Sequence, residues 1–380
     1  MKTYEFTGGK PPPESFPVQG LIEASARVLR QWGRALVYYP RQHEYAGRSV
    51  KGYLGLREVA SSRFAHREGM PLPVENIALT SGSMQAIELI GRHFITPGDT
   101  VITSELCYVG TLRFFRFLGA EVVGIPLDYT EGMKVDELDQ ALTTLTKEGR
   151  RPKLIYVTAN HQNPTGAILS LERRQRLVEL AEAFAVPIVE DDCYGDIDFE
   201  EGVIPPAMYR LDPAENVIFV ATFSKILGPG LRAGYFCAPD KWMEAILKER
   251  WDAGTSALNT MIIAEYLKEN LWSHIAQHIA IIKKKRDVLL SALDETLAGS
   301  VEWTVPRGGL FDWLTLPKAV DLKKLQATAL KRGVQFTPGQ SFHAADKEIP
   351  NLRLSYPHLS HEDIREGIQR LAACIQDQLN

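Results

Sequence analysis

Between about Leu56 and Ile218 the chain alternates short apolar runs with longer amphipathic stretches, and this alternation constrains its fold more than any other feature. Stretches such as Leu171–Phe184 carry apolar residues at helical spacing. The apolar runs have the length of buried strands, and they are Ile77–Thr80, Thr100–Thr103, Val122–Ile125, Leu154–Val157, Pro187–Val189 and Val217–Val220. Strands that alternate with helices predict an α/β fold with a mostly parallel central sheet flanked by helices.

After Asp240 the pattern turns helical, and the strand-like pieces that come later predict a second, smaller domain. The long helical stretch from about Leu271 to Leu297 suits an interdomain helix. The strand-like pieces that follow it are Phe311–Leu316, Val334–Thr337 and Leu352–Tyr356. We expect an N-terminal arm and part of the small domain in residues 1–40, a large domain in residues 41–270, and a smaller α+β domain in residues 271–380.

The first twenty residues are polar and rich in proline, with four prolines in Lys10–Pro17. Because proline lacks an N–H and biases the preceding residue towards extended backbone, this segment is not expected to form a regular helix. Its composition leaves two interpretations open. It is either a flexible tail, or an extended arm that crosses a partner subunit or borders a site.

Charge and cysteine content argue against several classes of partner. The 380 residues carry a net charge of -4, which gives no electrostatic reason to expect a nucleic acid or an anionic membrane. The one basic cluster, Lys283–Arg286, lies in a helical pattern and is typical of a solvated helix face. No apolar run has the length that crosses a bilayer, and we expect a soluble, cytoplasmic protein. No CxxC pair occurs, which favours reduced thiols over a disulfide framework or a metal site at Cys107, Cys193, Cys237 and Cys374.

Residues that can bind or react follow several predicted strands, which is where ligands bind in parallel sheets. Thr80–Gln85 contains small residues whose N–H groups and hydroxyls can converge on an anion at the start of a helix. Ser83 can equally be an ordinary helix N-cap. The segment Asn163–Gly166 follows the strand at Leu154–Val157, and its composition is that of a turn.

Two further motifs carry charged groups. Glu190–Tyr194 follows a strand, where acidic residues lose hydration free energy unless a cation pairs with them. This motif is therefore either a solvated loop or a carboxylate held for a cation. Thr222–Lys225 places a lysine among hydroxyls, and Arg232 follows seven residues later. A nucleophilic amine beside a guanidinium that can bind phosphate indicates a reactive site.

In this order the motifs resemble those of the fold-type I pyridoxal-phosphate enzymes, specifically the class I/II aminotransferases. Within them the chain looks closest to the branch that contains the kynurenine and α-aminoadipate aminotransferases. The resemblance runs from Phe6–Pro11 to Leu352–Ser355, which is nearly the whole chain. It implies the aminotransferase fold with a large pyridoxal-phosphate-binding domain, pyridoxal 5′-phosphate as cofactor, and an amino acid and a 2-oxo acid as substrates.

The resemblance implies a catalytic role for three residues. Lys225 forms the internal aldimine and moves the proton between the substrate Cα and the cofactor C4′. Asp191 pairs with the protonated pyridine nitrogen and preserves the ring as an electron sink. Tyr108 stacks on the ring, while Asn163 and Tyr194 hydrogen-bond its phenolate oxygen.

Further residues are implied in binding, and no metal ion is. Arg353 takes the substrate α-carboxylate as a bidentate pair, with Asn163 and Gly9 beside the substrate. Tyr53 reaches the phosphate from a partner subunit, so the resemblance also implies a homodimer with composite sites. Within one chain the phosphate is held by Ser83, the Met84 backbone, Thr222, Ser224 and Arg232.

The chain departs from the family pattern at three places. Met84 stands where relatives commonly have Gln, a change that a backbone contact to phosphate tolerates. His161 is either a substrate contact or a buried, hydrogen-bonded histidine, and Asp192 and Gln162 are expected to be structural. Tyr39–Val50 contains an insertion of about half a dozen residues relative to the family. It is either a surface elaboration or a loop that selects the substrate through Arg41, His43, Tyr45 and Arg48.

Three functions are compatible with these residues. The first is amino transfer from an L-amino acid to a 2-oxo acid, in amino-acid metabolism or a specialised biosynthesis. The second is another reaction of the same cofactor, such as elimination, replacement, cyclisation or oxidation, because a fold does not fix the reaction. The third is a non-catalytic, cofactor-sensing regulator. Such regulators carry an N-terminal DNA-binding segment, and the aminotransferase-like pattern begins within ten residues of Met1.

Overall fold

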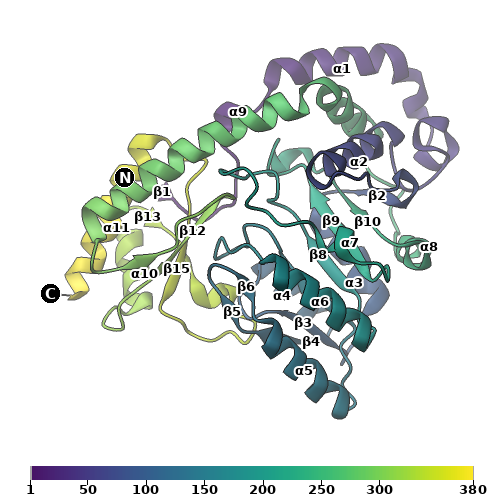
Figure 1. The fold of residues 1–380 in the computed structure, drawn as a ribbon. Coiled ribbons are helices and arrows are strands. Elements are labelled where there is room, and N and C mark those ends of the chain that lie inside the picture. Colours follow the sequence, from purple (N-terminus) through teal and green to yellow (C-terminus); the bar gives the residue numbers. More distant parts are fainter. Residues whose placement is uncertain (1, 380) are drawn as a thin grey trace.

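The computed structural model describes residues 2–379, and its largest sheet has the strand order β2-β10-β9-β8-β7-β3-β4 (Figure 1). Six of these strands are mutually parallel, and β10 (Gly234–Cys237) runs antiparallel between β2 and β9. The parallel strands are β2 (Ile77–Thr80), β3 (Thr100–Ser104), β4 (Glu121–Ile125), β7 (Leu154–Val157), β8 (Ile188–Asp191) and β9 (Val217–Thr222). The predicted α/β fold with a mostly parallel sheet is confirmed, and β10 is an additional strand.

Helices cover both faces of this sheet because successive strand residues point to opposite sides. In β9, Ile218 and Val220 pack on one face, while Val217, Phe219 and Ala221 pack on the other. The first face is covered by α3 (Ser83–Phe94), α4 (Val109–Phe117) and α8 (Asp240–Lys248). The second is covered by α2 (Leu54–Glu68), α5 (Val135–Lys147), α6 (Leu171–Phe184) and α7 (Met208–Leu211).

One long helix, α9 (Ala257–Leu297), extends from the large sheet to the smaller one and carries α1 (Val18–Trp32) along its outer side (Figure 1). It begins well before the predicted start at Leu271, and the Ser256 hydroxyl accepts a hydrogen bond from the N–H of Asn259 at its N-cap. Its first turns are therefore part of the large-domain core, where Met261 and Ile263 are buried.

The smaller sheet is antiparallel, with the order β11-β12-β15-β14. Its strands are β11 (Glu302–Trp303), β12 (Phe311–Thr315), β14 (Thr337–Pro338) and β15 (Asn351–Ser355), and α10 (Leu322–Lys331) and α11 (His361–Leu379) accompany it. This confirms the predicted α+β character of the C-terminal part. The remaining short elements are the hairpin β5 (Leu127–Asp128) and β6 (Gly132–Met133) and the 3₁₀ helices η2 (Gly33–Val37), η5 (Val74–Asn76), η6 (Pro229–Leu231) and η7 (Gly339–Phe342).

The N-terminal segment is an extended arm packed on the protein. Its strand β1 (Tyr4–Glu5) pairs in parallel with β13 (Val334–Gln335), and Phe6 is fully buried. The single-turn 3₁₀ helix η1 (Pro13–Ser15) follows, and α1 begins directly after Pro17. The arm interpretation is therefore correct. The expectation of no helix in the first twenty residues is wrong for the last three, because α1 begins at Val18.

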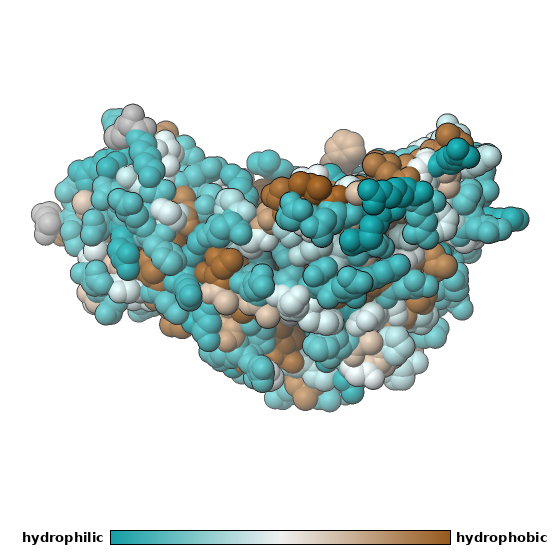
Figure 2. Space-filling model, turned by 90° about the horizontal axis from the view of Figure 1, so that it is seen from above, coloured by the Kyte–Doolittle hydropathy of each residue, from teal (hydrophilic) through white to brown (hydrophobic). Residues whose placement is uncertain are grey.

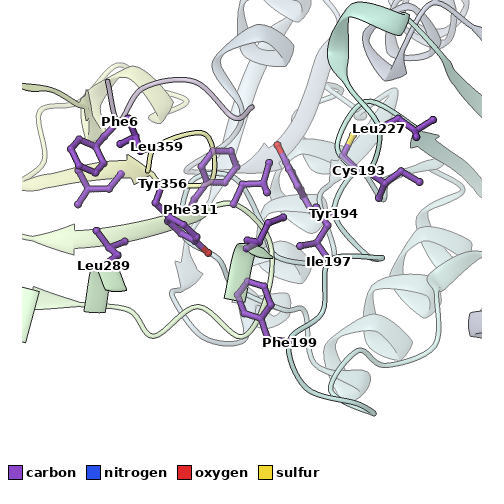
Figure 3. Close-up of a cluster of buried hydrophobic side chains, with 14 of the residues drawn as sticks. Phe6, Cys193, Tyr194, Ile197, Phe199, Leu227, Leu289, Phe311, Tyr356 and Leu359 are labelled. Atoms are coloured by element: carbon purple, nitrogen blue, oxygen red, sulfur yellow. The ribbon is translucent and has the colours of Figure 1, made fainter. Parts of the chain in front are cut away.

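A buried apolar cluster joins the arm to both sheets (Figure 3). Phe6 comes from the arm, Phe311 from β12, Leu289 from α9, and Tyr194 and Ile197 from the segment after β8. The rings of Tyr194 and Phe311 meet edge to face at 5.6 Å between centroids. The two sheets therefore share one core at the place where β8 ends.

The basic cluster on α9 is not a solvated face throughout. Lys285 is buried, donates to the carbonyl of Pro357 at 2.6 Å and pairs with Glu14 of the arm at 2.5 Å. Arg286 donates to the carbonyl of Pro306 at 2.7 Å and lies over the Phe199 ring. The prediction is wrong for these two residues because the arm and the segment before β12 cover that side of the helix.

The inserted segment forms two short 3₁₀ helices, η3 (Pro40–Gln42) and η4 (Glu44–Ala46). Tyr45 is buried against Val28 of α1 and Met261 of α9. Arg41 and Arg48 are exposed. The loop is therefore anchored by its aromatic residue and presents its cations to solvent.

The cysteine prediction agrees with the described residues, in which all four cysteines are buried and unpaired. Between residues 2 and 379, no group of histidine, cysteine and acidic side chains is placed to hold a metal ion. None of the helices in this range combines the length and apolar character needed to cross a bilayer.

Asp312 of β12 makes stability depend on pH. Burial raises its pKa from 3.8 to about 7, although the N–H of Trp313 and the Thr304 hydroxyl donate to its Oδ1 atom. Between about pH 4 and pH 7 the unfolded chain loses this proton while the folded chain keeps it, so stability falls as the pH rises. We expect Asp312→Asn to raise the free energy of unfolding at pH 8 by about 4 kcal/mol more than at pH 4. Chemical denaturation at both pH values measures this, with the exposed Asp294→Asn as control. Equal effects at both pH values would contradict it.

Candidate active site

The carboxyl ends of β2, β3, β8 and β9 lie at one edge of the large sheet and surround a cavity of about 430 Å³. The arm and the smaller sheet supply its remaining walls. Of the residues predicted for the site, all but Tyr53 line this cavity: Gly9, Ser83, Met84, Tyr108, Asn163, Asp191, Tyr194, Thr222, Ser224, Lys225, Arg232 and Arg353. Residues distant in sequence therefore meet because parallel strands end at the same edge.

One end of the cavity is suited to an anion. Helix α3 begins at Ser83, and its N-cap is Gly82, which has a φ of 85°. Gly82 has no side chain, so no side-chain hydrogen bond caps the helix, and the N-cap interpretation of Ser83 is wrong. A Cβ on Gly234 would lie 2.7 Å from the carbonyl carbon of Gly82, so a glycine at this position lets the helix terminus lie directly against β10.

Hydroxyls and a guanidinium complete this anion site. The Thr222 hydroxyl donates to Ser224 at 2.9 Å, which holds the two side chains together at the end of β9. Arg232 is exposed, and its guanidinium lies beside Gly82 and donates to the carbonyl of Ser81. Free N–H groups at a helix start, hydroxyls and an arginine together form a donor set for a phosphate.

Asp191, the last residue of β8, is a buried carboxylate with two protein donors. The Tyr156 hydroxyl donates to its Oδ2 atom, and the Cys193 thiol lies 2.8 Å from its Oδ1 atom. The same thiol lies 3.2 Å from the Ser83 hydroxyl. Burial raises the pKa of Asp191 above its ordinary value, so the carboxylate gains from a cationic partner in the cavity.

Lys225 places its amine inside the cavity. Its Nζ atom donates to the carbonyl of Gly9 at 2.9 Å and lies 5.8 Å from the centroid of the Tyr194 ring. Burial lowers the pKa of the amine, and the charges of Arg353 and Arg232 act in the same direction. A larger fraction of the amine is therefore neutral and nucleophilic than in an exposed lysine.

Arg353 of β15 is buried between the rings of Phe311 and Phe342, at 4.2 and 4.8 Å from their centroids. Its guanidinium donates to Asn163 Oδ1 at 2.7 Å and to the carbonyl of Thr7. Its Nε atom is buried without a hydrogen-bond partner among residues 2–379. Burial lowers the pKa to about 10, which keeps the group charged at pH 7. A charged, buried donor without a partner suits a substrate carboxylate.

The predicted aromatic residues lie in the same cavity. Tyr108 precedes α4 at its N-cap position and is 37% exposed, so its ring is accessible to a ligand. Tyr194 is buried, and its ring packs against Phe311.

Three polar residues near the motifs are structural. His161 is fully buried and does not line the cavity, so it is no substrate contact. Neither of its ring nitrogens has a hydrogen-bond partner within residues 2–379, which contradicts the expected hydrogen bond, and burial lowers its pKa to about 3. Asp192 pairs with Arg67 at 2.7 Å, and Gln162 donates to the carbonyl of Leu106 at 2.7 Å.

Tyr53 and the inserted loop do not line the cavity of their own chain. Tyr53 precedes α2 at its N-cap position and packs near Tyr45, with ring centroids 6.5 Å apart. The predicted substrate selection by Arg41, His43, Tyr45 and Arg48 stays a prediction, because none of these residues lines the cavity of its own chain.

Sequence reasoning missed several residues of the cavity wall. Tyr156 and Cys193 contact Asp191, while Phe311, Phe342 and Thr7 border Arg353. Cys193 lies within the motif Glu190–Tyr194, and this position in the sequence could have indicated that it belongs to the site. Tyr156 reads as an ordinary core residue of β7, and only the pairing of β7 with β8 reveals its role.

A half-buried lysine at the end of a parallel strand, a buried carboxylate and an anion site around one cavity define a pyridoxal-phosphate enzyme of fold type I. The residues present fit this cofactor: the donor set around Ser83 suits its phosphate, and buried Asp191 suits its pyridinium nitrogen.

Comparison with known proteins agrees with this assignment to the pyridoxal-phosphate enzymes. Residues 24–371 match the family described as aminotransferase class I and II. The chain is 36% identical to aromatic-amino-acid aminotransferase 1 of Thermococcus litoralis, over 98% of this chain and 88% of that protein. It is 33% identical to 2-aminoadipate transaminase of Thermus thermophilus, over 98% and 90% of the two chains. The structure of Pyrococcus horikoshii kynurenine aminotransferase superposes with a TM-score of 0.92 at 33% identity, over 100% of this chain and 92% of that one.

The chain therefore belongs to the class I and II aminotransferase family. It is a pyridoxal-phosphate-dependent enzyme that transfers amino groups between amino acids and 2-oxo acids.

Proposed function

We propose that the cavity around Lys225 is the site of this amino transfer, with Lys225 as covalent anchor and base. The observation that carries the proposal is the arrangement of two cations in one cavity. Lys225 and Arg353 both line it, and the Arg353 guanidinium, with a pKa of about 10, stays charged at pH 7. An amino acid bound by its carboxylate at Arg353 can thereby present its Cα to the lysine amine.

When bound, pyridoxal 5′-phosphate supplies an electron sink for the charge that develops at the substrate Cα. Lys225 removes the Cα proton once its amine is free, a role that its lowered pKa favours. Asp191 holds a proton on the pyridine nitrogen, and Tyr156 and Cys193 orient its carboxylate.

The remaining residues bind and orient. Ser83, the backbone of Met84, Thr222, Ser224 and Arg232 hold the phosphate, so the cofactor stays bound when its link to Lys225 is broken. Tyr108 covers one face of the ring, while Asn163 and Tyr194 donate to its phenolate oxygen. Gly9 forms part of the substrate wall beside the amine, since its carbonyl accepts a hydrogen bond from Lys225.

Absorbance spectra of the purified protein with pyridoxal 5′-phosphate test the proposal. We expect a visible band from cofactor joined to Lys225, and loss of this band when L-amino acids are added without a 2-oxo acid. The amino acids that remove it identify the donors, and a 2-oxo acid should restore it. Absence of the band, or release of ammonia in its place, would contradict the proposal.

We further propose a homodimer in which Tyr53 of one chain reaches the phosphate of the other. Apolar residues are exposed on the arm and α1, and Figure 2 shows hydrophobic surface on the face that carries α1 and α9. These residues are Phe16, Val18, Ile22 and Leu29, with Val37, Tyr38 and Tyr39 following them. An exposed apolar surface of this kind suits a second copy of the chain.

We expect Tyr53→Phe to raise the dissociation constant for pyridoxal 5′-phosphate by about tenfold, because one hydrogen bond to phosphate is lost. Equilibrium titration measures this constant, and light scattering measures the oligomeric state. Tyr129→Phe, at an exposed position between β5 and β6, is the control. An unchanged constant in a dimeric variant, or a monomeric active enzyme, would contradict the composite site.

We also propose the division into an arm and part of the small domain in residues 1–40, a large domain in residues 41–270 and a small domain in residues 271–380. Strands of the larger sheet occupy 77–237 and strands of the smaller sheet occupy 302–355, which supports the division. Four buried, unpaired thiols support a cytoplasmic location in amino-acid metabolism.

A further inference from the structure

Two backbone carbonyls beside the reactive lysine are bound by histidines. After β9 the chain makes one turn, in which the N–H of Leu227 donates to the carbonyl of Phe223. The carbonyls of Lys225 and Ile226, two and three residues after Phe223, accept no backbone N–H within residues 2–379. His278 Nε2 lies 2.9 Å from the Lys225 carbonyl, and His274 Nε2 lies 2.7 Å from that of Ile226.

His278 also contacts the N-terminal arm. Its Nδ1 atom lies 2.9 Å from the hydroxyl oxygen of Ser15, which closes η1 and lies 2.8 Å from the carbonyl oxygen of Pro12. The Lys225 amine contacts the same arm at Gly9. Lys225 is therefore linked to the arm in two ways. Its Nζ atom contacts the arm directly, and its backbone carbonyl contacts the arm through His278.

These contacts show which ring nitrogen of His278 carries the hydrogen. A carbonyl only accepts, so Nε2 of His278 carries a hydrogen and donates it to Lys225. Burial lowers the pKa of His278 to about 4, and the charge of His274 acts in the same direction, while the backbone carbonyl of Lys225 and the charges of Asp196 and Glu14 oppose it. Neutral His278 therefore keeps Nδ1 as an acceptor for the Ser15 hydroxyl.

His274 provides an internal comparison on the same helix. It is one turn away from His278, its ring is stacked on that of His278, and it holds the adjacent carbonyl. Its Nδ1 atom contacts Tyr266 of the same helix rather than the arm. Only His278 thus joins the lysine backbone to a segment that lines the substrate cavity.

We propose that His278 is a positioning residue that fixes the backbone of Lys225 and couples it to the N-terminal arm. The lysine side chain must leave and regain its covalent partner in each cycle, and a fixed backbone returns the amine to the same place. The arm forms the cavity wall at Thr7, Gly8 and Gly9, and the Thr7 carbonyl accepts from Arg353. His278 therefore holds the amine and the substrate wall in one geometry, an inference that rests on the proposed role of Lys225.

Four variants of the holoenzyme distinguish a positioning role of His278 from a role in packing alone. His278→Leu removes both bonds, and His278→Gln restores an N–H donor near the Nε2 position. Ser15→Ala removes only the bond to the arm, and His274→Leu removes the neighbouring bond. The measurements are kcat and KM, the pH at which the visible cofactor band changes, and the melting temperature.

We expect His278→Leu to lower kcat by about tenfold, the factor that corresponds to one hydrogen bond, and to shift the pH midpoint of the band. His278→Gln should restore both to within about threefold of the original enzyme, since its amide replaces the donor. Ser15→Ala should raise KM and leave the midpoint unchanged. His274→Leu should lower the melting temperature without moving the midpoint.

A His278→Leu enzyme with an unchanged kcat and midpoint, or a His274→Leu enzyme with an equal shift, would overturn the inference alone. A folded His278→Gln enzyme in which the pH midpoint of the cofactor band is not restored would also overturn the inference. An unmodified enzyme without any cofactor band would instead overturn the proposed role of Lys225, and this inference with it.

Discussion

Lys225→Ala is expected to lower turnover by about four orders of magnitude, because the change removes the covalent anchor and the base together. The cofactor should remain bound, since Ser83, Arg232 and Asp191 are unaffected by the substitution. Its absorbance should be that of a free aldehyde and not of cofactor joined to the protein. Steady-state assays with the donors identified above measure the loss, and dialysis followed by phosphate analysis measures retention.

Two controls accompany this experiment. Lys225→Arg keeps a positive charge in the cavity but provides no comparable nucleophile, and we expect it to be as inactive as the alanine variant. Lys284→Ala changes an exposed lysine of α9 and should retain full activity. Turnover near that of the unmodified enzyme in Lys225→Ala would refute the assignment of the reactive lysine.

Asp191→Asn is expected to lower kcat by about 10²–10³-fold, the loss typical when one preorganised electrostatic partner is removed from a reacting system. The amide has the shape of the carboxylate and still accepts from Tyr156. It carries no charge, so it no longer keeps a proton on the pyridine nitrogen. Single-turnover measurements with an amino donor isolate this effect from release of the product.

The adjacent carboxylate is a matched control. Asp192 is also buried, but it pairs with Arg67 and does not line the cavity. We expect Asp192→Asn to lower the melting temperature while the cofactor spectrum stays unchanged, because one partner of a buried ion pair is lost. Similar spectral changes in both variants would mean that the charge near β8 acts non-specifically and that Asp191 has no special role.

The features that the sequence predicted best are those that depend on residues close to one another along the chain. Runs such as Ile77–Thr80 and Leu154–Val157 coincide with β2 and β7, because a strand buried on both faces is apolar throughout. Because parallel strands end at the same edge of a sheet, the reactive residues that follow them lie along that edge. This is why Lys225 and Asp191 could be brought together without coordinates.

Features that depend on distant packing could not be predicted in this way. One such feature is the start of α9 at Ala257 and not near Leu271, because its first turns pack against α1. Lys285 is polar, but the arm covers it and Glu14 neutralises it. Likewise, the contact of Cys193 with Asp191 depends on how the segment after β8 turns, for which the sequence has no periodic signal.

The cavity is closed by residues from both ends of the chain, Gly9 of the arm and Arg353 of β15. During synthesis on a ribosome, β15 is among the last elements to emerge, whereas the large sheet is complete more than a hundred residues earlier. A nascent chain can thus hold a folded large sheet and still lack the substrate wall. Amino acids in the cell therefore meet a competent binding site only after β15 has been synthesised and has folded against the large sheet.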